Sequence, residues 1–302
     1  MSERSWRVLL VEVEAALRDA GFESAQAEAQ WLLQRVSGYG PAELARGGDE
    51  IATEVALAHL NRMVDERRAG RPLQYVLGMW SFRGLDLFVD PRVLVPRPET
   101  EIVAGYAIDE LLRQRRTVRA QRESRGSARP SVAADLGTGS GAIALALAHE
   151  VDRVEVWATD VSEDALAVAR SNVAGMGSVA TRIRLAQGSW FDALPGELRG
   201  RLDLVVSNPP YIAESEATDL PSDVLDHEPH LALFSGPTGL DALRTIVAGA
   251  GAWLAPGGSL VCELARHQGD RVRQLAVEHG FSDAVIRVDL TGRDRVLVAR
   301  RN

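Results

Sequence analysis

Three glycines at alternate positions mark the first segment whose residue types could do chemistry. The segment is Asp135–Gly141 (DLGTGSG), which follows an apolar run typical of a strand and opens a run typical of a helix. Glycine lets a backbone turn tightly and approach a ligand without a Cβ clash, and helix N-termini favour carboxylates or phosphates. The pattern predicts a ligand-binding loop, although a plain strand-to-helix turn would use the same glycines.

An acidic residue follows the next predicted strand. Asp160 closes the sequence WATD and lies 23 residues after Gly137. A carboxylate at this place can accept hydrogen bonds from both hydroxyls of a bound ribose. Aspartate is also a good N-cap for the helix predicted to begin near Ser162, so Asp160 alone decides little. Combined with the glycine loop, it indicates a cofactor that contains adenosine.

The most specific signal is the tetrapeptide Asn208-Pro209-Pro210-Tyr211, directly after the predicted strand Leu202–Ser207. In an open α/β sheet, ligands bind outside the carboxyl ends of the strands, so this tetrapeptide should lie beside the cofactor. The prolines fix φ and leave a rigid loop with free carbonyls. Asn208 adds a side-chain acceptor and Tyr211 a flat ring. Two acceptors and a ring are suited to holding a planar –NH2 group, whereas a structural Asn-Pro turn is the alternative.

Composition excludes several other chemistries. All 34 basic residues are arginine, so no lysine can form a Schiff base or bind phosphate in a P-loop. The net charge of −8 disfavours tight binding to a nucleic-acid backbone. The segment His227–His230 (HEPH) could suggest a metal site, but Pro229 keeps both histidines from sharing one helical turn, and no metal is expected.

The single cysteine, Cys262, fits a reducing compartment, and no apolar run reaches membrane-spanning length. We therefore expect a cytoplasmic protein.

Three parts of the chain must position these residues. Residues 1–70 predict a helical bundle with helices at about 6–20, 24–38 and 50–69, because apolar residues recur at helical spacing. Residues 71–98 predict a β-hairpin linker with extended runs at 75–82 and 85–95. Residues 99–302 predict the catalytic domain, which begins with a helix to about Leu112. Seven arginines between positions 113 and 130 suggest a solvated, mobile insertion or, alternatively, an RNA-binding patch.

After Pro130 the hydrophobic pattern alternates between strands and helices, which is typical of a parallel sheet covered on both faces. The last two strands, Ala284–Leu290 and Arg295–Arg300, flank TGRD and should pair antiparallel. The prediction is a mixed α/β fold whose strands are 131–136, 154–159, 182–187, 202–207, 259–264, 284–290 and 295–300.

The chain resembles class I S-adenosylmethionine-dependent methyltransferases that act on planar amino groups. The resemblance lies in three motifs that occur in this order: DLGTGSG, the acid of WATD and NPPY. Together with RPLQYVLG, VLVPRPETE and LTGRDRV, they resemble the release factor glutamine methyltransferase family over nearly the whole chain. The PRPETE segment distinguishes that family from the related ribosomal protein glutamine methyltransferases. The resemblance implies a Rossmann-like seven-stranded sheet with an antiparallel edge hairpin.

The resemblance also implies the substrates and the site. The methyl donor is S-adenosyl-L-methionine, and the acceptor is the glutamine of the Gly-Gly-Gln motif in class 1 peptide chain release factors, which the N-terminal bundle would help to recognise. The enzyme would act as a monomer, without direct contact to nucleic acid or membrane. Asn208, Pro209 and Tyr211 would be catalytic, and Pro210 would join them in binding substrate. The cofactor-binding residues would be Gly137, Thr138, Gly139, Ser140, Gly141, Asp160, Trp190 and Asn208, with Ser189 where relatives often have an acid.

Three alternative functions remain open at this point. A nucleic-acid amino-methyltransferase would use the same NPPY chemistry on adenine or guanine, but the acidic charge disfavours it. A nicotinamide-dependent dehydrogenase would normally carry G-x-G-x-x-G, and here the third glycine comes one residue early. A silent binding module would not need Asn208 and Tyr211.

Overall fold

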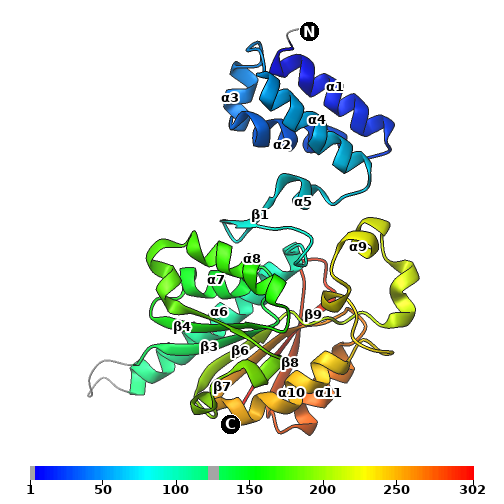
Figure 1. Cartoon of the computed structure of the whole chain (residues 1–302). Helices are drawn as coiled ribbons and strands as arrows, with labels where there is room; N and C mark the ends of the chain where they lie inside the picture. The colour runs from blue at the N-terminus through cyan, green and yellow to red at the C-terminus, as the bar shows by residue number, and fades with distance from the viewer. Residues whose placement is uncertain (1–3, 122–128) are drawn as a thin grey trace. The chain divides into compact units, whose positions relative to one another are not determined.

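The computed structural model describes residues 4–121 and 129–302 (Figure 1). Part of the predicted arginine-rich insertion, residues 122–128, lies outside the described residues. The chain divides into two compact units, which comprise residues 1–79 with 221–227 and residues 80–220 with 228–302. Across the described ranges, no helix is both long enough and apolar enough to cross a membrane.

The first unit is helical, as the sequence predicts. It contains α1 (Trp6–Asp19), α2 (Ala25–Ser37), α3 (Pro41–Arg46), α4 (Glu54–Arg68), α5 (Leu73–Leu77) and α9 (Ser222–His227). The apolar stripe of α1 is buried through Leu9, Val13 and Leu17, which confirms the helical periodicity. Arg67 of α4 donates to Glu28 of α2 in a buried ion pair of 2.6 Å, so the register of these two helices is fixed.

Local signals explain where the predicted boundaries in this unit were wrong. The helix expected from residue 50 begins at Glu54, because Thr53 caps it by accepting from the backbone N–H of Ala56 at 3.2 Å. The short helix α3 was not predicted from the sequence. Tyr75 was predicted to begin an extended run, and instead it lies in α5. That helix has only five residues, and its sequence LQYVL is too apolar and too short to be distinguished from a strand.

The predicted hairpin is present but short. Strands β1 (Met79–Phe82) and β2 (Leu85–Phe88) are joined by Arg83 and Gly84, both with positive φ, as a two-residue hairpin turn requires. Residues 89–95 were predicted to be extended and form no strand. Asn172 fixes the end of β2, because its side-chain oxygen accepts from the Phe88 N–H at 2.7 Å and its nitrogen donates to the Phe88 carbonyl at 3.0 Å.

Within the described residues of the second unit, seven strands form one mixed sheet with the order β5-β4-β3-β6-β7-β9-β8. The predicted antiparallel edge is confirmed, since β9 runs antiparallel to both β7 and β8. Strand β3 pairs in parallel with β4 on one side and β6 on the other. This reversal places a ligand-binding crevice at the carboxyl ends of β3, β4 and β6. The strands are β3 (Ser131–Leu136), β4 (Val154–Asp160), β5 (Ile183–Gln187), β6 (Leu202–Ser207), β7 (Leu254–Glu263), β8 (Asp283–Val288) and β9 (Asp294–Arg300).

Helices cover both faces of this sheet (Figure 1). On one face lie α6 (Pro98–Gln121), α7 (Ala142–Glu150) and α8 (Glu163–Ala174), and on the other lie α10 (Asp241–Trp253) and α11 (Gly269–Glu278). Each face has its own buried apolar cluster. The helix α11 was not predicted from the sequence, although Val272, Leu275 and Ala276 have the spacing of a buried helical stripe.

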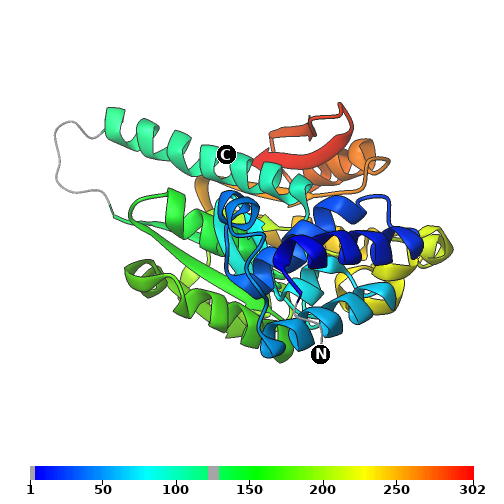
Figure 2. The same cartoon turned by 90° about the horizontal axis from the view of Figure 1, so that it is seen from above.

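The helix α6 is longer than predicted and includes the first arginines of the expected insertion. Figure 2 shows α6 beside β9 along the sheet. Arg113 donates to Glu110 at 3.0 Å, and Gln114 donates to the Asp203 carbonyl at 2.9 Å. Arginine and glutamine are good helix formers, so this polar run continues the helix. The expected insertion therefore begins as a continuation of α6, which ends at Gln121.

Candidate active site

The glycine loop has the backbone conformation that its sequence requires. Gly137, Gly139 and Gly141 all have positive φ, at 72°, 55° and 85°. The N–H groups of Gly137 and Thr138 both donate to the carbonyl of Thr159 at 2.8 Å, which ties the loop to the end of β4. L-residues with side chains are disfavoured at such φ values. The three glycines therefore hold a backbone arch between β3 and α7.

A buried carboxyl group supports this arch from below. Asp135 is 1% exposed, and its Oδ2 accepts from the Thr138 hydroxyl at 2.6 Å and from the Ala144 N–H at 3.2 Å. Its Oδ1 has no hydrogen-bond partner among the described residues. Burial raises the pKa of Asp135 to about 7, against the opposing effect of these bonds. A cationic group bound above the loop would favour the ionised carboxylate.

Asp160 serves the loop rather than the helix that follows it. Its Oδ2 accepts from the Gly139 N–H at 2.9 Å, and its Oδ1 accepts from the Ser162 N–H at 3.0 Å. The N-cap of α8 is Ser162, whose hydroxyl accepts from the Ala165 N–H at 3.1 Å. The capping interpretation of Asp160 is therefore wrong. Burial raises the pKa of Asp160, and hydrogen bonds from the backbone N–H groups of Ser162, Gly139 and Val161 oppose this rise.

Trp190 lies against the glycine loop in a conformation that is unusual for a large residue. Its φ is 47°, and its ring is so close to Gly137 that a Cβ there would lie 3.4 Å from ring atom Cζ3. Strained backbone of this kind is frequent at ligand sites. Ser189, one residue earlier, lines the cavity next to the glycine loop that is described below. Its hydroxyl forms no capping bond to the short helix that follows.

The tetrapeptide NPPY follows β6 as predicted, and hydrogen bonds fix both of its ends. Before it, the Ser207 hydroxyl donates to the Leu136 carbonyl at 2.6 Å, which joins the ends of β6 and β3. After it, the Tyr211 carbonyl accepts from Gln268 Nε2 at 3.0 Å. The Asn208 side-chain nitrogen donates to the hydroxyl of Thr100 at 3.1 Å. The Tyr211 hydroxyl donates to Glu263 at 3.1 Å, and burial, followed by the Glu263 charge, raises the tyrosine pKa.

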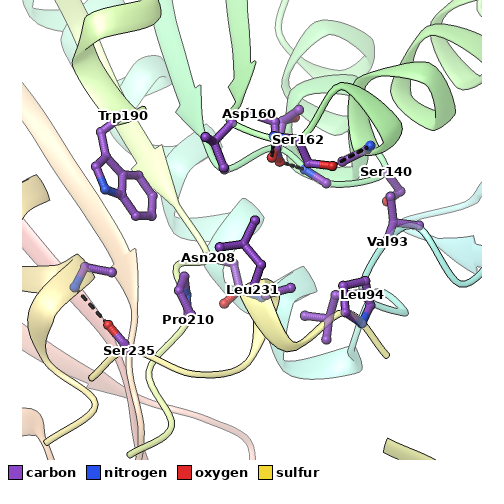
Figure 3. A pocket seen from close by; sticks show the side chains of 18 of the residues that line it. Val93, Leu94, Ser140, Asp160, Ser162, Trp190, Asn208, Pro210, Leu231 and Ser235 are labelled. Atoms are coloured by element: carbon purple, nitrogen blue, oxygen red, sulfur yellow. Dashed lines mark hydrogen bonds between the residues drawn. The ribbon is translucent and has the colours of Figure 1, made fainter. Parts of the chain in front are cut away.

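These elements surround one cavity of about 470 Å³, a volume suited to a small-molecule ligand (Figure 3). The cavity brings together most of the predicted site residues, which are Gly137, Thr138, Gly139, Ser140, Asp160, Trp190, Asn208 and Pro210. Gly141, Pro209 and Tyr211 do not line it. Gly141 instead caps α7, and a Cβ there would lie 3.5 Å from Ala169.

Two walls of the cavity come from segments in which sequence reasoning identified no binding residue. Val93 and Leu94 precede α6, and Leu231 lies between NPPY and α10 (Figure 3). Phe234 of the latter segment also lines the cavity. Leu231 is 63% exposed, so part of its apolar side chain is available for contact with a ligand. An ion pair of 2.7 Å joins the two segments to each other, between Arg97 and the almost fully buried carboxylate of Glu228.

The ion pair with Arg97 gives Glu228, the acidic residue of the HEPH segment, a structural role. Both carboxylate oxygens of Glu228 accept from Arg97, and Pro229 lines the cavity. Among the described residues, no group of three histidine, cysteine or acidic side chains is arranged to hold a metal ion.

Comparisons with known proteins add a second line of evidence. The model of the PrmC N-terminal domain family matches residues 9–78, and the model of the Methyltransferase small domain family matches residues 125–229. A release factor glutamine methyltransferase from Streptomyces coelicolor is 42% identical over 298 residues, which cover 97% of this chain and 98% of that protein. One from Moorella thermoacetica is 40% identical over 297 residues, with 98% of each chain covered.

Among solved structures, the hMettl16 catalytic domain in complex with MAT2A 3'UTR hairpin 6 has a TM-score of 0.53 and 12% sequence identity. The match covers 89% of this chain and 91% of that chain. At this identity the likeness establishes the α/β fold alone.

Proposed function

Because the chain belongs to the release factor glutamine methyltransferase family, we propose that it transfers a methyl group from S-adenosyl-L-methionine to a glutamine side-chain nitrogen. The acceptor is the glutamine of the Gly-Gly-Gln motif in class 1 peptide chain release factors. The observation that carries this proposal is that Asn208 and Pro210 line the same cavity as the glycine loop and Asp160. A nucleophile held by NPPY would therefore lie beside a ligand held by the loop.

The residues around the loop fit the methyl donor. Asp160 lines the cavity and would accept from the ribose hydroxyls, and the arch at Gly137–Gly141 leaves room for close backbone approach. Trp190 and Ser189 would flank the adenine. When bound, this donor supplies an electrophilic methyl group on a positively charged sulfur. The apolar surfaces of Val93 and Leu94 would exclude water from that group.

The NPPY residues would orient the acceptor. An amide nitrogen is a weak nucleophile because its lone pair is delocalised into the carbonyl. Asn208 Oδ1 and the Pro209 carbonyl would accept the two amide protons, direct the nitrogen toward the methyl group and weaken its conjugation. Tyr211 would pack against the amide plane. The N–C bond forms as the C–S bond of the donor breaks. No base is needed at the start, because the nitrogen becomes acidic only as the new bond forms, and it then loses its proton to water. Alignment of this kind contributes about 7–11 kcal/mol in well-oriented reactions.

The helical first unit would contribute to recognition of the intact release factor. The family model that matches residues 9–78 covers most of this unit. A chain lacking residues 1–70 should bind the methyl donor in calorimetry but methylate intact factor with a lower kcat/KM. An equal kcat/KM on intact factor would rule out this role, and lost donor binding would instead show that the shortened chain is misfolded.

Mass spectrometry of purified class 1 release factor tests the activity directly. Incubation with the enzyme and the methyl donor should add one methyl group, mapped by fragmentation to the Gly-Gly-Gln glutamine. A factor with that glutamine changed to alanine should stay unmodified. Modification elsewhere in the factor, or none, would contradict the proposal.

A further inference from the structure

The side chain of Asn208 is connected to a buried acid by a chain of hydrogen bonds that leads away from the cavity. Asn208 Nδ2 donates to the Thr100 hydroxyl at 3.1 Å, and that hydroxyl donates to Glu263 Oε2 at 2.8 Å. The other oxygen, Oε1, accepts from the Tyr211 hydroxyl at 3.1 Å. Thr100 is 3% exposed and Glu263 is 1% exposed, so water does not replace these partners. One carboxyl group thus contacts both ends of the NPPY segment, directly or through one hydroxyl.

The direction of each bond in this chain follows from the donors available. An ionised carboxylate can only accept, so it takes the single proton of the Thr100 hydroxyl. The threonine oxygen can then only accept from its other neighbour, which requires the –NH2 end of Asn208 to face it. The two ends of an asparagine amide have nearly the same shape, so this network determines which one points where. With Nδ2 committed to Thr100, Oδ1 is the atom left for a ligand.

We propose that Glu263 and Thr100 are positioning residues for the methyl transfer, because the Glu263 carboxylate, acting through Thr100, makes Asn208 present an acceptor oxygen to the substrate amide. This inference rests on the proposed function. We call this chain of hydrogen bonds, from Glu263 through Thr100 to Asn208, the relay. Its carboxylate also holds the Tyr211 ring in place through the second oxygen. Reversal of the relay would turn the asparagine –NH2 toward the substrate –NH2, where two donors face each other and neither can bond.

The charges around Glu263 make the relay sensitive to pH. Burial raises the pKa of Glu263 to about 7, and Glu99 adds to this effect, whereas the Thr100 bond, the Arg295 charge and the Tyr211 bond oppose it. These groups come from α6, from β9 and from the loop after β6. The protonated acid would carry a donor of its own, and Thr100 could then accept from it and donate to Asn208 Oδ1. The active orientation therefore belongs to the ionised form and is lost as the pH falls through about 7.

Paired substitutions in the full-length enzyme test the relay. Thr100→Val keeps the shape of the side chain and removes its hydroxyl, and we expect kcat to fall at least about tenfold, in line with the loss of an oriented catalytic group. Thr100→Ser keeps the hydroxyl and should stay within about threefold of the wild type. Glu263→Gln should lower kcat and abolish the rise of kcat between pH 6 and 8. Calorimetry should find donor affinity within about threefold throughout, which also shows that each variant is folded.

A readout that needs no turnover separates failure of the relay from failure of the proposed function. The chain has four asparagines, at positions 61, 172, 208 and 302, so selective ¹⁵N labelling gives a simple side-chain spectrum. The Asn208 –NH2 signal should shift with a midpoint near pH 7 in the wild type, and the shift should disappear in Glu263→Gln and Thr100→Val. If the signal titrates but the glutamine stays unmethylated, the proposed function is wrong and the relay stands. An Asn208 signal that does not respond, or an unchanged kcat in Thr100→Val, would overturn the relay.

Discussion

The two halves of the cavity are built by different means. On the glycine-loop side, backbone groups do most of the work, since the N–H groups of Gly137, Thr138 and Gly139 all donate to Thr159 or Asp160 at the end of β4. On the NPPY side, Asn208 is oriented by Thr100 at the start of α6, which in turn bonds Glu263 at the end of β7. Gly139 and Asp160 of the first half are 21 residues apart in the sequence, whereas the bonds of the second half join residues 108 and 163 positions apart. We therefore expect the first to govern donor affinity and the second to govern turnover.

The same contrast explains how much could be predicted from sequence. The spans of β3 and β6 and the loop that follows each were predicted correctly, because strand pattern, glycines and prolines are local signals. The cavity walls at Val93 and Leu231 and the partners of Asn208 were not found, because each depends on segments brought together only by the fold. A signal for Glu263 does exist, since an acid closing the apolar run SLVCE must be buried with a partner.

The largest effect should come from Asn208→Ala. The substitution removes the side-chain acceptor while leaving the glycine loop untouched, so we expect kcat to fall about 100- to 1,000-fold. The dissociation constant of the methyl donor should change by less than about threefold. Single-turnover kinetics with intact release factor and calorimetry with the donor measure the two quantities separately. If kcat and donor affinity fell together, the division between the two halves would be wrong.

Asp160→Asn should have the opposite effect, which is a loss of donor affinity with little change in kcat. Hydrogen bonds to a charged group are worth about 1.5–3 kcal/mol, so donor affinity should weaken about 10- to 150-fold. The kcat at saturating donor should stay near the wild-type value, because Asp160 does not contact the acceptor side. Calorimetry and initial rates over a range of donor concentrations check this. A fall in kcat with unchanged affinity would assign Asp160 to the chemistry instead.

A smaller effect is expected from Gly139→Ala. Its φ of 55° is strained for alanine by about 1–2 kcal/mol. A Cβ there would meet no protein atom within 4 Å, although the residue lines the cavity. We expect donor affinity to fall about 5- to 30-fold. Gly280→Ala is the matched control, because Gly280 also has positive φ and open space but lies outside the cavity. It should lower the free energy of unfolding similarly without changing affinity, and equal losses of affinity in both would contradict a local role for the loop.

The smallest effect should come from Glu110→Gln, which tests whether the anchoring of α6 matters for turnover or only for stability. Glu110 accepts from Arg300 at 2.6 Å, from Ser259 at 2.7 Å and from Arg113 at 3.0 Å. Burial alone would raise its pKa, but these partners outweigh burial and lower the pKa from its ordinary 4.5 to about 2. The carboxylate therefore stabilises the fold above pH 4.5, and this contribution is lost as the pH falls toward 2.

At pH 7, Glu110→Gln should lower the free energy of unfolding by about 1–2 kcal/mol, a modest amount because Arg300 and Arg113 are partly exposed. The difference from the wild type should shrink between pH 4.5 and pH 3, as followed by urea unfolding. The kcat should be unchanged, since Thr100 is held by its own bonds at the start of the same helix. A loss of kcat as large as that of Thr100→Val would mean that the whole of α6, rather than the single hydroxyl, sets the position of Asn208.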